Sequence, residues 1–178
     1  MSTAAESKAV IATLAEDRPG LVSELSAVVH GLGLNIEDSR MTVLGGEFAV
    51  LMSVAGEEQA LTALESRLAE KAADAGFVYM FRRTADRSAA EHRLFIVTVE
   101  SMDHPGIVSG VTRFFSERGV NIRELNTDTE RAAHTGAPVF NLTMEIEVSS
   151  AQEIDELDEA FAAFSEAEGL DGELEPAS

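Results

Sequence analysis

The sequence contains no cysteine among its 178 residues, few positive charges and no long apolar run. Without cysteine the chain cannot form disulfides, which fits a reducing compartment. The first residues lack a basic region followed by an apolar core, so we expect no signal peptide. The longest apolar run, residues 48–56, is far shorter than the roughly 20 residues of a membrane-spanning helix. These absences predict a cytoplasmic protein that makes no membrane contact.

Positive charge is scarce, and its distribution along the chain is uneven. The formal net charge is −19, with about −5 before residue 90 and about −14 after it, and no Lys or Arg follows Arg131. Nucleic-acid affinity depends on Lys and Arg displacing condensed counterions, so we expect no direct binding of DNA or RNA. The acidic stretch 149–178 is expected to be a solvated helix face with a frayed end, or a docking surface for a basic partner. A high-salt host would also explain the excess of acid.

The sequence also lacks patterns that are typical of catalytic and metal sites. Its four histidines are scattered, with no i, i+4 pair, and no G-x-S-x-G or Walker loop is present. The segment "GLGLN" at 31–35 lacks the third glycine and the preceding strand of a dinucleotide fingerprint. We therefore predict no enzyme, no metal and no cofactor.

The sequence does contain an internal repeat. The segment "EDRPGLVSELSAVVHGLGLNIED" at 16–38 returns, 86 positions later, as "MDHPGIVSGVTRFFSERGVNIRE" at 102–124. In both copies the apolar residues recur at the spacing of an amphipathic helix. They are Leu21, Val22, Leu25, Val28, Val29 and Leu32 in the first copy and Ile107, Val108, Val111, Phe114 and Phe115 in the second. The match in phase predicts two copies of one fold.

Each half reads as strand, helix, two strands, helix and strand. A β-type run precedes each repeated helix, which ends at Gly33 or Gly119. Gly45-Gly46 predicts a tight hairpin in the first half, whereas the second half has a longer connection at 130–138. The strands are expected at 9–15, 36–44, 47–55 and 76–83, then at 93–101, 139–148 and 169–176. The second helices are indicated by Leu61, Leu64 and Leu68, and by Ile154, Leu157, Phe161 and Phe164.

This order predicts an α+β protein of two ferredoxin-like domains, each with two helices on one face of a four-stranded antiparallel sheet. We expect domains at 8–83 and 94–175, with a linker at 84–93. The strand at 139–148 alternates apolar and polar residues, so its outer face should meet solvent. The run at 48–55 barely alternates, which predicts a cover on the bare face of the first sheet. The second domain or another subunit could supply it, and a homodimer is one such arrangement.

The repeated segments resemble the opening of ACT domains, small regulatory modules that typically bind amino acids. The tandem pair, together with the segment 131–148, is similar to the glycine cleavage system regulatory protein family, and the resemblance covers residues 8–175. It implies a regulator that senses a small amino acid, with glycine as the first candidate, and that acts on a transcription factor or an enzyme. The alternative is a docking module without a small ligand, which presents its acidic surface to a partner.

The candidate ligand site follows from the chemistry of a helix start. A proline costs no hydrogen bond there, a preceding aspartate can cap the free N–H groups, and a glycine lets a ligand approach them. An α-carboxylate would lie at these amides, and an aspartate or asparagine oxygen would accept from the α-ammonium. The resemblance implies that the asparagine comes from a neighbouring domain. The predicted ligand-binding residues are Asp17, Arg18, Gly20, Leu21, Val22, Asn35, Ile36, Asp103, His104, Gly106, Ile107, Val108, Asn121 and Ile122.

Simpler explanations exist for the same residues. Asp-x-Pro-Gly is also an ordinary helix start, and asparagine after glycine is a common turn residue. His104 and its counterpart Arg18 could both be plain surface residues. Which loop binds a ligand, and which amino acid it takes, stay open in the sequence.

Overall fold

The computed structural model describes residues 6–85, 92–131, 136–150 and 152–177. The chain divides into two compact units, Met1–Ser88 and Ala89–Ser178, each with its own core. Residues 86–91 of the predicted linker, and 132–135 of the long connection, lie outside the described residues. No helix in the described ranges has both the length and the apolar character needed to cross a membrane.

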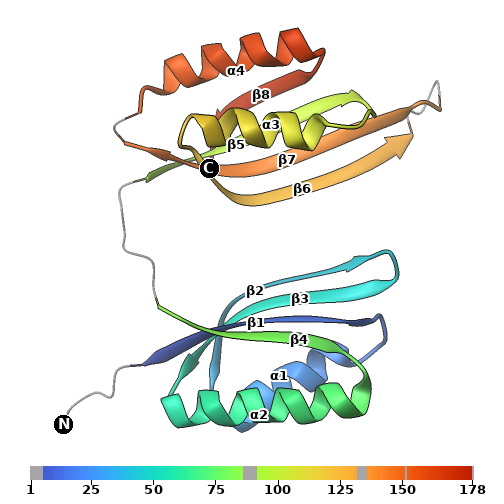
Figure 1. Ribbon diagram of the computed structural model, residues 1–178, viewed down its shortest axis with the longest axis vertical. Helices are drawn as coiled ribbons and strands as arrows, with labels where there is room; N and C mark the ends of the chain where they lie inside the picture. The colour runs from blue at the N-terminus through green and yellow to red at the C-terminus, as the bar shows by residue number, and fades with distance from the viewer. Residues whose placement is uncertain (1–5, 86–91, 132–135, 151, 178) are drawn as a thin grey trace. The chain divides into compact units, whose positions relative to one another are not determined.

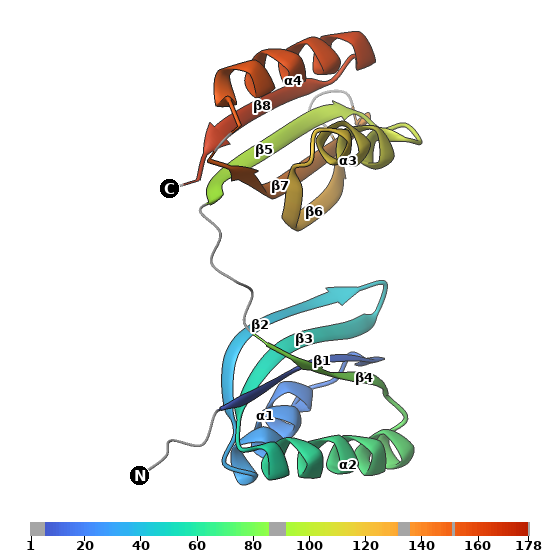
Figure 2. The same cartoon turned by 60° about the vertical axis from the view of Figure 1, so that its left-hand side comes forward.

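The first unit is a four-stranded antiparallel sheet with both helices on one side (Figures 1 and 2). The strand order is β2-β3-β1-β4, so the two central strands, β3 and β1, are not consecutive in the chain. The elements are β1 (Ser7–Glu16), α1 (Leu21–Gly31), β2 (Asn35–Leu44), β3 (Glu47–Gly56), α2 (Glu58–Ala75) and β4 (Val78–Thr84).

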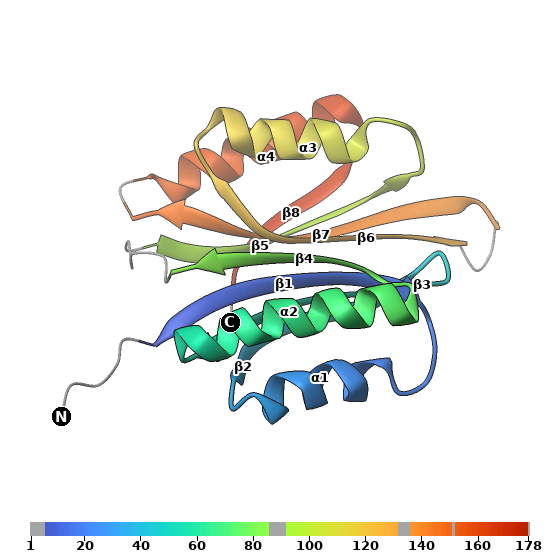
Figure 3. The same cartoon turned by 60° about the horizontal axis from the view of Figure 1, so that its bottom comes forward.

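The second unit repeats this architecture, with strand order β6-β7-β5-β8 and both helices on one side of the sheet (Figure 3). Its elements are β5 (His92–Met102), α3 (Ile107–Glu117), β6 (Asn121–Arg131), β7 (Pro138–Ser149), α4 (Ile154–Glu168) and β8 (Asp171–Pro176). The predicted α+β class and the β-α-β-β-α-β order of both halves are confirmed.

Each core lies between the helices and the inner face of the sheet. Most helix residues that the spacing placed on one face are buried or half-buried, with Leu61 and Leu64 fully inaccessible in α2 and Phe161 1% exposed in α4, whereas Val22 and Val108 are 39% exposed. The second core is the more aromatic, because Phe114 and Phe115 of α3 pack against Phe161 and Phe164 of α4 at ring centroid distances of 4.9 to 5.5 Å. Apolar burial of this kind is the main source of stability in each unit.

Glycines with positive φ lie at the ends of α1 and α3 and in the β2–β3 turn. Gly33 (φ 71°) and Gly119 (φ 68°) adopt the left-handed conformation after α1 and α3, and the next residues donate back to the helix, as in a Schellman motif. Gly45 and Gly46, with φ of 61° and 90°, close the β2–β3 hairpin in the positive-φ geometry that such turns need.

The predicted aspartate caps are wrong. The residue that caps α1 is Gly20 (φ 92°), the one that caps α3 is Gly106 (φ 105°), and in neither described helix does a side chain make a cap hydrogen bond. The chain turns from strand into helix through this left-handed glycine, so Asp17 lies three residues before the cap, too early to occupy the cap position. Pro19 likewise precedes the first helical residue, Leu21, by two positions.

The open face of the first sheet, opposite its helices, has an apolar centre, with polar and charged residues of β2 along one edge. Four large side chains there are 46 to 71% exposed, and the register places them in adjacent rows with small apolar neighbours. The residues of this apolar open face are Val10, Ala12, Leu14, Ala49, Leu51, Val78 and Met80. What covers the face stays a prediction.

The open face of the second sheet is acidic. Strand β7 alternates as predicted, with Leu142, Met144 and Ile146 buried at no more than 1% exposure. The other side of β7 shares an outward face with residues of the other three strands of the sheet. The nine carboxylates of this acidic open face are Glu100, Glu124, Asp128, Glu130, Glu145, Glu147, Asp171, Glu173 and Glu175.

Candidate ligand site at the two helix starts

The loop between β1 and α1 is held by backbone hydrogen bonds at both ends. The Asp17 N–H donates to the Gly46 carbonyl at 3.2 Å, which fixes the loop beside the β2–β3 turn. The Gly20 carbonyl accepts from the Glu24 N–H at 2.9 Å and so begins the helix. The sequence predicted that Gly20 lets a ligand approach because it lacks a Cβ. In the structure glycine is required by the positive φ instead, since a Cβ there would meet only Glu24 Oε1, at 4.0 Å.

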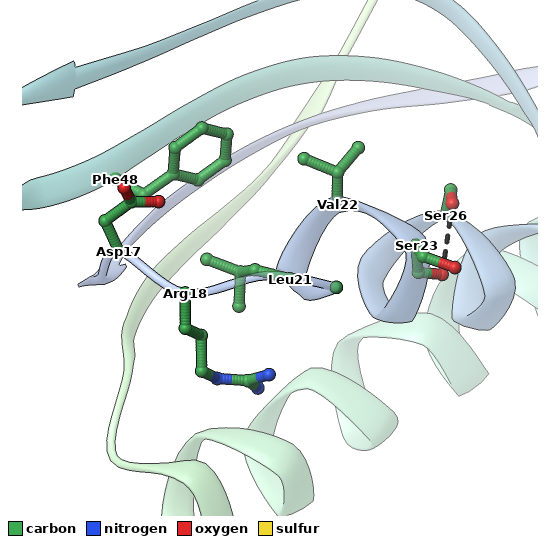
Figure 4. Close-up of a pocket in the computed structure, with 8 residues that line it drawn as sticks. Asp17, Arg18, Leu21, Val22, Ser23, Ser26 and Phe48 are labelled. Atoms are coloured by element: carbon green, nitrogen blue, oxygen red, sulfur yellow. Dashed lines mark hydrogen bonds between the residues drawn. The ribbon is translucent and has the colours of Figure 1, made fainter.

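A hollow of about 560 Å³ lies at this helix start (Figure 4). Asp17, Phe48 and Val22 lie on one side of the loop, and the Arg18 guanidinium points to the other. Its lining is Asp17, Arg18, Gly20, Leu21, Val22, Ser23, Ser26 and Phe48. Five of the predicted ligand-binding residues therefore surround one hollow that mixes apolar, hydroxyl and charged groups.

An ion pair flanks the first helix start. The Arg18 guanidinium donates to both carboxylate oxygens of Glu24, at 2.7 and 2.8 Å. The hydrogen bond and the charge of Glu24 raise the pKa of Arg18, and the hydrogen bond from Arg18 lowers the pKa of Glu24. Because both side chains are more than 40% exposed, the pair contributes little to stability.

The second helix start has the same backbone with different side chains. The Asp103 N–H donates to the Pro138 carbonyl at 3.4 Å, and the Gly110 N–H donates to the Gly106 carbonyl at 2.8 Å. His104 replaces Arg18, and its Nδ1 lies 3.3 Å from the Pro105 carbonyl oxygen. Gly110 replaces Glu24, and among the described residues no ion pair links this loop to α3. The second helix start is therefore less polar than the first.

Both helix starts present backbone groups of the kind that favour an anion. The first N–H groups of a helix have no partner inside it and lie at the positive end of the helix dipole. No side chain of the described chain caps α1 or α3, so the protein does not fill these positions itself. Val22 and Val108 are both 39% exposed, and Leu21 and Ile107 are buried beneath.

The asparagine half of the predicted site lies elsewhere. Asn35 opens β2 after the far end of α1, so roughly 16 Å of an 11-residue helix separates it from the Gly20 loop of its own unit. Asn121 has the matching place in the second unit, where its Nδ2 donates to Glu147 at 2.8 Å and leaves its carbonyl as an acceptor. Ile36 and Ile122 are half-buried against the cores. One unit alone does not bring both halves together.

Sequence reasoning missed three residues that line the first hollow, and the pairing role of Glu24. Ser23 and Ser26 lie on the first turns of α1, where helical spacing could have placed them. Phe48 comes from β3, and only the β1–β3 register brings it beside the loop. Within the described ranges, no group of three or more His, Asp or Glu residues could hold a metal ion.

Comparison with known proteins identifies both halves of the chain. Residues 8–82 and 95–166 each match an ACT domain model. The chain is 30% identical over 164 residues to the glycine cleavage system transcriptional repressor of Escherichia coli, which covers 92% of this chain and 86% of that protein. The repressor of Shigella flexneri matches with the same identity and coverage.

Solved structures extend the similarity to three dimensions. A protein of unknown function from Galdieria sulphuraria is 29% identical, with a TM-score of 0.83 and coverage of 97% of this chain and 99% of the other. A protein provisionally assigned as a glycine cleavage system transcriptional repressor gives 27% identity and a TM-score of 0.76, with coverage of 98% and 99%. The chain is therefore a tandem ACT-domain protein of the glycine cleavage system transcriptional repressor family.

Proposed function

We propose that the protein is a non-enzymatic regulator that binds a small amino acid and acts on the glycine cleavage system through a partner protein. The observation that carries this proposal is the pair of uncapped helix starts in a chain 30% identical to a transcriptional repressor of that system. The ligand's α-carboxylate would bind the amides after Gly20 or Gly106. Asp17 or Asp103 would accept from its ammonium group.

The proposed site is completed from outside each unit. The acceptors Asn35 and Asn121, with Ile36 and Ile122, lie at the far ends of their helices, so a second domain or a second copy must bring them to a helix start. Ligand binding would then favour one arrangement of the two contributors over others, because it contacts both only in that arrangement. A partner protein can detect such a change.

The partner is expected to be a protein. A net charge of −19 and an acidic open face on the second sheet repel phosphate backbones, so the proposed regulator would not bind DNA directly. A transcription factor or an enzyme fits this requirement. Glycine is the first candidate ligand, because the relatives are repressors of the glycine cleavage system.

Isothermal titration calorimetry with glycine, serine, alanine and the other common amino acids tests the proposal. We expect a saturable signal for at least one of them below millimolar concentration. Gly20→Val and Gly106→Val, each made alone, should remove the signal of one helix start, because valine is strained at positive φ. Absence of heat and of any thermal shift with every amino acid would refute amino-acid sensing.

The acidic open face supports a second candidate function, a docking module that needs no small ligand. Nine carboxylates on one sheet face would attract a basic protein surface. In that case both glycine variants would bind the partner as the wild type does, and no amino acid would change the affinity.

A further inference from the structure

The apolar open face of the first sheet carries no helix of its own unit, although its composition is that of a packed surface (Figure 1). Its apolar positions are continuous over three adjacent strands, β3, β1 and β4. A continuous exposed apolar patch marks a place where another surface packs. The charged residues around the patch indicate which surface that is.

Charges of opposite sign lie at the two ends of this face. At one end Glu16 of β1 and Glu47 of β3 are exposed register partners, and like charges placed opposite one another destabilise a sheet. Neither carboxylate makes an ion pair with any residue that the structure describes. At the other end the cations are Lys8 of β1 and Arg82 of β4. Lys8 is paired with Glu37 at 2.9 Å, whereas the exposed Arg82 has no ion-pair partner in the described ranges.

We propose that this face is the contact between two copies of the chain, related by a two-fold axis that runs across the strands near Ala12. Such an axis reverses the strand direction, so each strand lies over the same strand of the second copy and the two ends of the face exchange. Apolar rows then pack on apolar rows, and Glu16 lies beside the second copy's Lys8 and Arg82. The inference goes beyond the proposed function and does not depend on a ligand.

Other arrangements suit the charges less well. A two-fold axis along the strands would leave the ends in place and bring Glu16 over Glu47 of the second copy, so that four carboxylates would gather at each end of the contact that they share. An acidic partner surface is also unsuitable, because its carboxylates would lose water against the apolar centre without gaining a cation there. The axis across the strands avoids both costs.

The face is large enough for a weak dimer. Four strands about 4.8 Å apart, each with about nine residues at roughly 3.3 Å per residue, give a footprint of roughly 19 by 30 Å. Two copies would together bury about 1,100 Å², which is near the lower limit for a specific interface. Face-to-face sheets pack about 10 Å apart, so side chains from both copies would fill the space between them. We therefore expect a dimer that dissociates at micromolar concentrations.

Analytical ultracentrifugation of the full chain over a range of concentrations tests the proposal, and the wild type should form dimers. Leu51→Glu should weaken the dimer at least about 30-fold, because two carboxylates would meet near the axis and lose water. Leu51 is 49% exposed, so the variant should keep its fold, which amide spectra of each unit verify. Ala69→Glu, at an exposed position of α2, is the matched control and should leave the dimer unchanged.

A charge exchange tests the direction of the axis. Glu16→Arg and Arg82→Glu should each weaken their own dimer by about two- to fivefold per contact, because like charges then meet. An equal mixture of the two variants should form a mixed dimer as tight as that of the wild type, since opposite charges meet again.

Three results would overturn the proposal. A chain that stays monomeric at every concentration would assign the cover of this face to another segment of the chain or to a foreign protein. A dimer that Leu51→Glu leaves intact would place the contact elsewhere. A mixture of the Glu16 and Arg82 variants that is no tighter than either alone would contradict the axis across the strands.

Discussion

The open faces of the two sheets differ in chemistry although their strand orders match. In the first unit this face has an exposed apolar centre, with Leu14, Leu51, Val78 and Met80 between 46 and 71% exposed. In the second it carries nine carboxylates, and Arg123, paired with Glu145 and Glu147, is its main cation among the described residues. Both inner faces, by contrast, are packed with buried apolar side chains.

The difference shows which parts of a duplicated fold can diverge. The left-handed glycines at the helix starts and ends recur in both units, since other residues would strain the backbone there. The inner faces keep their apolar phase because the cores require it. The open faces and the residues beside the helix starts carry no such requirement. They are where the two units can acquire separate roles.

The largest expected effect tests whether the two units are stabilised separately. Phe115 is fully buried among the aromatic rings of the second core, so Phe115→Ala should cost roughly 3–5 kcal/mol of that unit's unfolding free energy. Leu64→Ala is the matched change in the first core, with an expected cost of roughly 2–5 kcal/mol. Denaturant melts followed by unit-specific amide signals measure both.

Separate cores predict that each variant lowers the melting midpoint of its own unit alone. If Phe115→Ala lowered the midpoints of both units together, they would unfold as one cooperative body. The comparison between units would then not extend to their stability.

The next effect concerns the glycines that the two units share. Gly20→Ala and Gly106→Ala place a Cβ at φ of 92° and 105°, which should cost roughly 1–2 kcal/mol in the affected unit. Gly31→Ala is the control, since this glycine has ordinary helical backbone and open space around it. It should leave stability unchanged or raise it by up to about 1 kcal/mol. Thermal unfolding measures the stability of the three variants. Equal values for all three would contradict the strain expected at the positive φ of Gly20 and Gly106.

A smaller effect is the difference between the two units in how their stability depends on salt concentration. Like charges facing one another across strands destabilise a sheet by roughly 0.2–1 kcal/mol per pair, and salt screens them. Raising the salt concentration should therefore stabilise the second unit more than the first. Asp171→Lys, opposite Glu100, should reduce that salt response, whereas Met80→Lys on the apolar open face should leave the first unit's response nearly unchanged. Identical salt responses in both units would contradict the contrast.

The sequence predicted much of this fold and less of the site. The repeat, the helix phase and the positions of the glycines are local patterns, so the order of helices and strands along the chain and the helix ends at Gly33 and Gly119 followed from them. The aspartate caps did not, because the capping residue depends on the φ of Gly20, which no spacing reveals. Phe48 was missed because its place beside the loop depends on sheet register. The Arg18–Glu24 pair depends on a turn in the backbone between its members.

The smallest predicted effect is the titration of that pair. Hydrogen bonding from Arg18 lowers the pKa of Glu24, with further contributions from the charge of Arg18 and from that of Lys71 on α2. A lowered pKa means that the pair's contribution to stability is present above the ordinary glutamate pKa of about 4.3 and disappears as the pH falls through the lower folded-state value.

Carbonyl-detected nuclear magnetic resonance of the Glu24 side chain measures this titration directly. In Arg18→Gln the titration midpoint should move up toward the ordinary value, and equal midpoints in the two proteins would show that the pair does not persist in solution. Since the second unit has Gly110 at the same place, this titration belongs to the first helix start alone.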